Sequence, residues 1–165
     1  MVAEIKHSIV VDVDIQTLRL LGNDGQVLLE APISTARKGV GEINGSEQTP
    51  RGRHIIRAKI GARQPVNTIF VGRRSTNEIY TSELREQHPG RDWILTRILW
   101  LSGTEPGKNR LGNVDTMRRY VYIHGAPDED EMGVPGSHGC IKMRNRDVIE
   151  LFDRVALYTP VIIKA

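Results

Sequence analysis

Hydrophobic and polar residues alternate in several short stretches of the chain, and this period of two is typical of half-buried β-strands. The stretches expected to form strands are residues 9–15, 17–21, 26–30, 53–60, 68–71, 93–101 and 120–124. The turn formers Asn23-Asp24-Gly25 join two of them into a predicted hairpin. Residues 93–101 are apolar on both faces apart from Thr96 and Arg97, as expected of a central strand.

Helix signals are restricted to two segments. Ser75 and Glu78 form a capping-box pattern ahead of a short helix that we expect to end near Pro89. Asn145 can cap a second helix that runs to about Leu157, with an apolar stripe that we expect to pack in the core. The sequence therefore predicts a mainly β fold, a β-sandwich of mixed sheets with two short helices.

The length and charge of the chain narrow the class of protein. A length of 165 residues suits one domain, so we expect residues 1–165 to fold as a single unit. The net charge is +3, from 23 basic and 20 acidic residues, and scattered basic residues do not indicate nucleic-acid binding. No run approaches the roughly 18 apolar residues that span a bilayer, so no membrane partner is expected.

The first residues show neither the basic region nor the apolar region of an export signal. We therefore expect a cytoplasmic protein, with the periplasm or the cell wall as the alternative if Met1 is not the native start. A single cysteine is compatible with either compartment.

The chain contains one cysteine, Cys140, which cannot form a disulfide within the chain. A catalytic cysteine attacks as a thiolate, and its ordinary pKa of about 8.5 must be lowered by a nearby imidazole or helix N-terminus. His124 ends the alternating strand 120–124 on its polar face, and a loop rich in turn formers can return Cys140 to it. Gly136 and Gly139 permit a tight turn that aims the N–H groups of Gly139 and Cys140 at one point, as an oxyanion hole requires.

Two other interpretations of Cys140 remain open. A lone cysteine is often an inert, buried thiol. Alternatively, His124, His138 and Cys140 can supply three zinc ligands, although no Cys-x-x-Cys or His-x-x-x-His pair accompanies them. His54, within the predicted strand 53–60, is expected to be structural.

His124-Gly125, the glycine-rich loop and Ser137-His138-Gly139-Cys140 resemble the signature of the L,D-transpeptidase catalytic domain, also called the YkuD domain. Other segments resemble the family in the same order along the chain. They are Ile33-Ser34-Thr35, Thr49-Pro50-Arg51-Gly52, Asn109-Arg110-Leu111-Gly112, Ile141-Lys142-Met143-Arg144-Asn145 and Thr159-Pro160-Val161. The interval between His124 and Cys140 is a little shorter than usual in the family, and Lys142 stands where an arginine is common.

The resemblance implies a cysteine-dependent acyl transfer on the tetrapeptide stem of peptidoglycan, at the bond between the diamino acid and the terminal D-Ala. It implies Cys140 as the nucleophile, His124 as the base and the carbonyl of Gly125 as the group that orients the imidazole. The residues expected to contact the substrate are Tyr122, Ser137, His138 and Lys142. No cofactor or metal is expected, and carbapenem-type β-lactams are expected to acylate the thiol.

The acceptor of the acyl group decides which reaction the protein catalyses. Water gives an L,D-carboxypeptidase that trims muropeptides during recycling, which is the function we expect, and an amine of a second stem gives 3→3 cross-links instead. A non-catalytic module that binds wall peptides is a more distant alternative, and rapid alkylation of Cys140 near pH 7 would argue against it. The acidic loop at residues 128–131 is expected to be solvated, with binding to an amine of the stem as the other interpretation.

Overall fold

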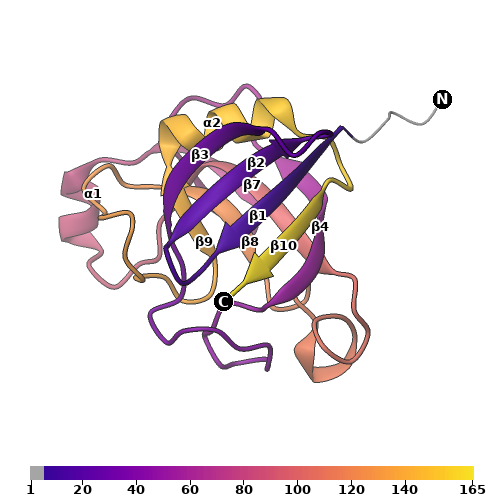
Figure 1. Cartoon of the computed structure of the whole chain (residues 1–165). Coiled ribbons are helices and arrows are strands. Elements are labelled where there is room, and N and C mark those ends of the chain that lie inside the picture. The colour runs from indigo at the N-terminus through magenta and orange to yellow at the C-terminus, as the bar shows by residue number, and fades with distance from the viewer. Residues whose placement is uncertain (1–5) are drawn as a thin grey trace.

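Strands are the main regular element of residues 6–165, which the computed structural model describes (Figure 1). The strands are β1 (His7–Asp12), β2 (Thr17–Gly22), β3 (Val27–Ser34), β4 (Gly52–Ile60), β5 (Thr68–Val71), β6 (Arg74–Ile79), β7 (Ile94–Gly103), β8 (Tyr122–Ala126), β9 (Ile141–Arg144) and β10 (Pro160–Lys164). The helices are α1 (Ser82–Gln87), α2 (Asn145–Arg154) and the single 3-10 turn η1 (Gly112–Val114). The prediction of a mainly β fold with two short helices is confirmed.

The strands of residues 6–165 belong to one sheet, in the order β4-β10-β1-β2-β3-β9-β8-β7-β5-β6. Because β4 also pairs with β7, the strands from β4 to β7 in this order close into a barrel-like wall. The packed layers of the predicted sandwich are therefore opposite walls of one sheet. Most neighbours are antiparallel, including the predicted hairpin of β2 and β3, whereas β1 lies parallel to β10 and β8 lies parallel to β9.

The interior of the barrel is apolar because alternate residues of each strand point inward. Ile9 of β1 and Leu18 of β2 are fully buried there. Helix α2 lies along the top of the barrel in Figure 1, and its stripe of Val148, Leu151 and Phe152 joins the same core. The apolar stripe predicted for the second helix is thus part of the core.

The first helix begins later than predicted. Residues 74–79, which contain the capping-box pattern of Ser75 and Glu78, form strand β6 instead. They pair with β5 across a tight turn, and this pairing outweighs the local helix signal. Thr81 caps α1, since its Oγ1 accepts a hydrogen bond from the N–H of Leu84 at 3.2 Å. The predicted cap at Ser75 is therefore wrong.

The second helix begins at Asn145, but Asn145 is not its N-cap. Arg144 holds the N-cap position, and the helix ends before Leu157. The Asn145 side chain is buried, where its Oδ1 accepts from Thr96 Oγ1 at 2.6 Å and its Nδ2 donates to Asn67 Oδ1 at 2.8 Å. These bonds tie α2 to β7 and to the residue before β5, so the side chain predicted to cap the helix anchors it instead.

Candidate active site

The parallel pairing of β8 with β9 brings His124 and Cys140 to the same part of the sheet. His124 is the register partner of Lys142, and Cys140 directly precedes β9. The backbone N–H of Tyr122 donates to the Sγ of Cys140 at 3.3 Å. Tyr122, His124 and Cys140 line one hollow, so the loop between the two strands does return the thiol to the histidine.

The orientation of His124 is set by the residue that follows it. The buried imidazole lies with its Nδ1 at 2.6 Å from the carbonyl oxygen of Gly125. Because a carbonyl can only accept, Nδ1 carries the proton and Nε2 is left as the basic nitrogen. Gly125 itself has no room for a side chain, since a Cβ would collide with Asn145 Oδ1 and lie 2.7 Å from the carbonyl oxygen of Leu95. The backbone that holds the imidazole is therefore fixed by packing.

Burial controls the charge of both reactive groups. It lowers the pKa of His124 and raises the pKa of the Cys140 thiol to about 12. Cys140 precedes a strand and not a helix, so no helix N-terminus opposes this effect. Near neutral pH the resting pair is therefore a neutral thiol and a neutral imidazole, and the expected lowering of the thiol pKa is not found. The proton has to leave the sulfur as the sulfur attacks.

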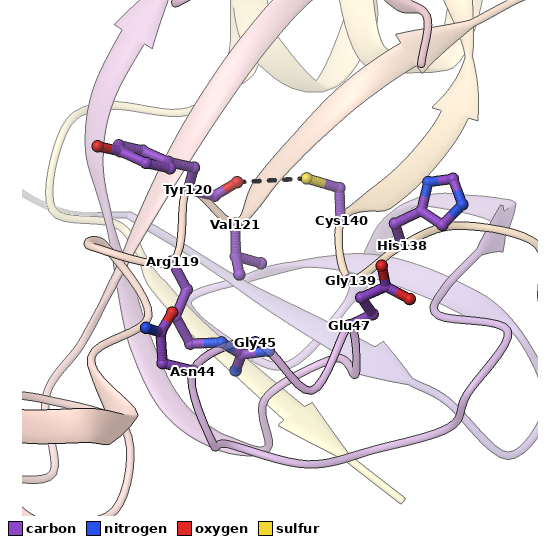
Figure 2. A pocket seen from close by; sticks show the side chains of 9 residues that line it. All are labelled: Asn44, Gly45, Glu47, Arg119, Tyr120, Val121, His138, Gly139 and Cys140. Atoms are coloured by element: carbon purple, nitrogen blue, oxygen red, sulfur yellow. Dashed lines mark hydrogen bonds between the residues drawn. The ribbon is translucent and has the colours of Figure 1, made fainter. Parts of the chain in front are cut away.

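The thiol has a local acceptor in the carbonyl of Tyr120, which lies 3.5 Å from Sγ (Figure 2). Tyr120 has a φ of 56°, so it leaves the extended conformation and β8 starts at Tyr122 rather than at the predicted residue 120. The turn thus directs the carbonyl of Tyr120 and the N–H of Tyr122 at the same sulfur.

The turn before Cys140 is held by Ser137. Ser137 Oγ accepts from the N–H of Gly139 at 3.2 Å and donates to the carbonyl of Cys140 at 2.5 Å. Gly139 has a φ of 132°, a conformation that favours glycine. Within residues 6–165 the N–H of Cys140 has no hydrogen-bond acceptor, so of the two predicted oxyanion donors it is the one that is free. Ser137, predicted to contact substrate, shapes this turn.

Two hollows of about 220 and 260 Å³ meet at Cys140. Figure 2 shows the first, lined by Asn44, Gly45, Glu47, Arg119, Tyr120, Val121, His138, Gly139 and Cys140. The second, which we call the His124 hollow, is lined by Arg73, Asp92, Ile94, Tyr120, Tyr122, His124, Ser137, His138 and Cys140. Exposed His138 borders both, and buried Tyr122 and Ser137 border the second, which places three predicted substrate contacts beside the thiol.

The sequence interpretation missed six polar or aromatic residues of the hollows: Asn44, Glu47, Arg73, Asp92, Arg119 and Tyr120. Arg119 donates to the carbonyls of Gly41 at 3.2 Å and Gln48 at 2.6 Å, which holds the segment between them beside the site. Tyr120 lies within the alternating run that ends at His124, so it was the residue that local pattern could have found. Arg73, in the turn between β5 and β6, and Asp92, just before β7, are distant along the chain and carry no such signal.

Lys142 lies beside His124 in the strand register but does not line either hollow. Its Nζ forms an ion pair with Asp130 at 2.7 Å, and Arg85 of α1 binds the same carboxylate at 2.6 Å. Glu129 accepts a hydrogen bond from Tyr80. These ion pairs fix the acidic loop at Asp130, whose side chain is 11% exposed. The other acidic residues of the loop are exposed, as predicted. A substrate contact by Lys142 stays a prediction.

Two features of residues 6–165 bear on other classes of protein. No group of three or more His, Cys, Asp or Glu side chains is placed to hold a metal ion there. In the same residues, no helix is long and apolar enough to cross a membrane.

A thiol beside a histidine whose tautomer is fixed by a carbonyl is typical of enzymes that transfer acyl groups through cysteine. The sequence model of the L,D-transpeptidase catalytic domain, YkuD, matches residues 6–163. The chain belongs to this family. No curated protein matches the sequence.

Solved L,D-transpeptidases share the fold. One from Mycobacterium smegmatis is 23% identical with a TM-score of 0.58, over 98% of this chain and 59% of that protein. L,D-transpeptidase 3 from Mycobacterium tuberculosis, in complex with a faropenem-derived adduct, is 16% identical with a TM-score of 0.59, over 98% and 61%. One from Enterococcus faecium is 20% identical with a TM-score of 0.57, over 96% and 50%. The chain thus spans 50% to 61% of the length of these proteins.

Proposed function

We propose that this protein removes the terminal D-Ala from peptidoglycan tetrapeptide stems through an acyl-enzyme at Cys140, with water as the acceptor. Membership of the L,D-transpeptidase family supports acyl transfer on peptidoglycan. The observation that carries the proposal is the imidazole of His124, locked by the Gly125 carbonyl at 2.6 Å in the hollow that also contains the thiol. This geometry suits a general base for a neutral thiol.

In the acylation step, Sγ of Cys140 attacks the carbonyl carbon at the L-centre of the diamino acid, and Nε2 of His124 takes the thiol proton. The free N–H of Cys140 donates to the oxygen on which negative charge develops. The intermediate then collapses, the bond to the D-Ala nitrogen breaks, and His124 returns the proton to the departing amine. A thioester to Cys140 remains.

In the second step, departure of D-Ala leaves space in the His124 hollow for water. His124 takes a proton from that water as its oxygen attacks the thioester carbonyl, and the thiolate leaves with a proton from the imidazolium. The products are a tripeptide stem, D-Ala and the original neutral pair.

An amine acceptor is the second candidate, and the first hollow favours it. Glu47, half exposed and paired with Lys38 at 2.8 Å, lines that hollow beside Cys140 and adds negative charge that would attract the ammonium group of another stem. Transfer to that amine would give a 3→3 cross-link instead of a hydrolysed stem.

Mass spectrometry of a diaminopimelate tetrapeptide muropeptide, incubated with the protein or with Cys140→Ala, tests the proposal. Loss of one alanine without a dimer is the expected result, and it should require Cys140. A Cys140-dependent dimer would identify the transpeptidase. No change of mass, with the thiol titrated as reduced, would leave the non-catalytic binding module as the better interpretation.

Acylation by a β-lactam gives a second readout of the same thiol. The Mycobacterium tuberculosis relative was solved with a faropenem-derived adduct, and we propose that carbapenems also acylate Cys140. Intact-protein mass after incubation with imipenem should rise by one adduct in the wild type and stay unchanged in Cys140→Ala.

A further inference from the structure

Among residues 6–165, Arg73 of the His124 hollow forms no ion pair, although Asp92 lines the same hollow. Arg73 sits in the turn between β5 and β6 with a φ of 64°. Its guanidinium lies 4.7 Å from the centre of the Tyr120 ring and 5.1 Å from that of Trp100. Its Nη1 donates to the hydroxyl of Tyr122 at 3.0 Å. Three aromatic side chains therefore hold this cation in place at the wall of the hollow.

Most of the hydrogen-bonding capacity of Arg73 is unused. A guanidinium has five N–H donors, and within residues 6–165 the guanidinium of Arg73 meets one acceptor, the hydroxyl of Tyr122. It forms no ion pair in that part of the chain, in contrast to Arg85, which pairs with Asp130. Its pKa is raised, mainly by the bond to Tyr122, so it stays charged at every pH of interest.

Arg119, the arginine of the other hollow, is used differently. Its Nη atoms donate to the carbonyls of Gly41 and Gln48 and to the hydroxyl of Ser46. Through these bonds Arg119 holds the neighbouring segment in place. Of the two arginines beside Cys140, Arg73 is the one with donors available to a ligand.

We propose that Arg73 is a specificity-determining residue that binds a carboxylate of the ligand in the His124 hollow. An orientated guanidinium can bind a carboxylate through two parallel N–H bonds. The inference rests on the proposed function in so far as the ligand is a peptidoglycan stem. Such a stem offers two carboxylates near the reacting carbonyl, that of the terminal D-Ala and that at the free end of the diamino acid.

The experiment measures binding separately from turnover. Titration calorimetry on Cys140→Ala and on Cys140→Ala with Arg73→Gln uses three tetrapeptide stems, one unmodified, one with a C-terminal D-alaninamide and one amidated at the diamino acid carboxylate. Arg73→Gln should weaken binding of the unmodified stem about ten- to hundred-fold, the loss expected when a charge-assisted hydrogen bond is removed. Amidation of one of the two carboxylates should weaken binding to Cys140→Ala by a similar factor. If Arg73→Gln does not weaken binding of that amide any further, the amidated carboxylate is the one that Arg73 binds.

Two further variants separate recognition from structure. Arg73→Lys keeps the charge but loses the planar pair of donors, so an intermediate loss of affinity is expected. Arg57→Gln is the matched control, because Arg57 also donates to a tyrosine, Tyr158 at 3.3 Å, and lies 5.9 Å from its ring centre outside both hollows. This control should leave binding of all three stems unchanged.

The inference is overturned if Arg73→Gln leaves binding of the unmodified stem unchanged, or if it weakens all three stems equally. It is also overturned if Cys140→Ala binds none of them. Turnover by the wild type reports on the proposed function independently. Binding that depends on Arg73, together with no change of stem mass in the wild type, would contradict the acyl transfer and support the carboxylate site.

Discussion

Lys142, the strand neighbour of His124, is paired with Asp130 at 2.7 Å, and both side chains are largely buried. Burial acts to raise the pKa of Asp130, but hydrogen bonds from Lys142 and Arg85 outweigh it and the pKa is lowered. The positive charge of Lys142 and the negative charge of Asp130 act on His124 in opposite directions. The ion pair therefore holds the loop after β8 in place, and it leaves no unpaired charge next to His124.

Removal of the Asp130 charge should destabilise the protein. Asp130→Asn leaves Lys142 and Arg85 without their shared carboxylate, and loss of one partner of a largely buried pair costs about 3 kcal/mol. Urea unfolding at pH 7 measures the change in the free energy of unfolding. Glu30→Gln is the control, because it removes the exposed pair with Arg19 and should cost less than about 1 kcal/mol. Equal effects of the two changes would contradict the structural role of Asp130.

The raised pKa of Cys140 predicts slow alkylation of the free enzyme. With a pKa of about 12, the thiolate fraction at pH 7 is hundreds of times or more below that of an ordinary thiol of pKa about 8.5. The iodoacetamide reaction rate should therefore be far below that of glutathione at pH 7 and still rising at pH 10. A plateau below pH 8 would instead show a thiolate–imidazolium pair. Slow alkylation would not by itself argue for an inert thiol, because His124 can remove the proton during acylation.

Local pattern pointed to His124 and Cys140, which line one hollow in the structure, and their catalytic roles stay a prediction. The alternation that ends at His124 and the glycine-rich turn before Cys140 are short-range features, and each survives in the folded chain. Strands β1 to β5, β7 and β8 were found for the same reason, since their inward residues repeat with a period of two, whereas the pattern predicted neither β6 nor β9 as a strand.

What the sequence did not predict depends on partners that are distant along the chain. Ser75 carries a helix signal, yet pairing with β5 places it in a strand. Asn145 carries a cap signal, yet Thr96 and Asn67 offer its amide buried bonds. Arg73 reaches the site only because β5 joins the sheet next to β7. The sequence around Arg73 contains no pattern that predicts this position.

The charge of Asp92 should influence the acid limb of the pH profile of kcat/KM. Burial lowers the pKa of His124, and the negative charge of Asp92, in the same hollow, acts to raise it. Asp92→Asn should therefore lower that pKa further. Because the neutral imidazole is the base, the acid limb of kcat/KM should move to lower pH. Asp24→Asn, in the hairpin turn between β2 and β3, is the control and should leave the limb in place. A shift to higher pH would contradict this assignment of the base.

The protein should become less stable as the pH falls, in part because of His54. This histidine is buried, with its Nδ1 at 3.0 Å from the carbonyl oxygen of Gly52 and its Nε2 at 2.9 Å from Thr116 Oγ1, which agrees with the structural role expected of it. Burial lowers its pKa to about 4. Between pH 6.5 and 4 the unfolded chain therefore binds a proton that the folded chain does not, and the free energy of unfolding decreases as pH falls.

The full penalty below pH 4 is about 3 kcal/mol, from the difference between an ordinary histidine pKa of 6.5 and the lowered value. Buried His124, whose pKa is also lowered, adds to the slope below pH 6.5. The test is therefore the comparison of wild type with His54→Gln, measured by urea unfolding at several pH values between 4 and 7. The variant should be less stable at pH 7 but lose less stability on acidification. His88→Gln removes an exposed imidazole and should parallel the wild type. Parallel curves for wild type and His54→Gln would mean that His54 does not remain neutral in the folded protein.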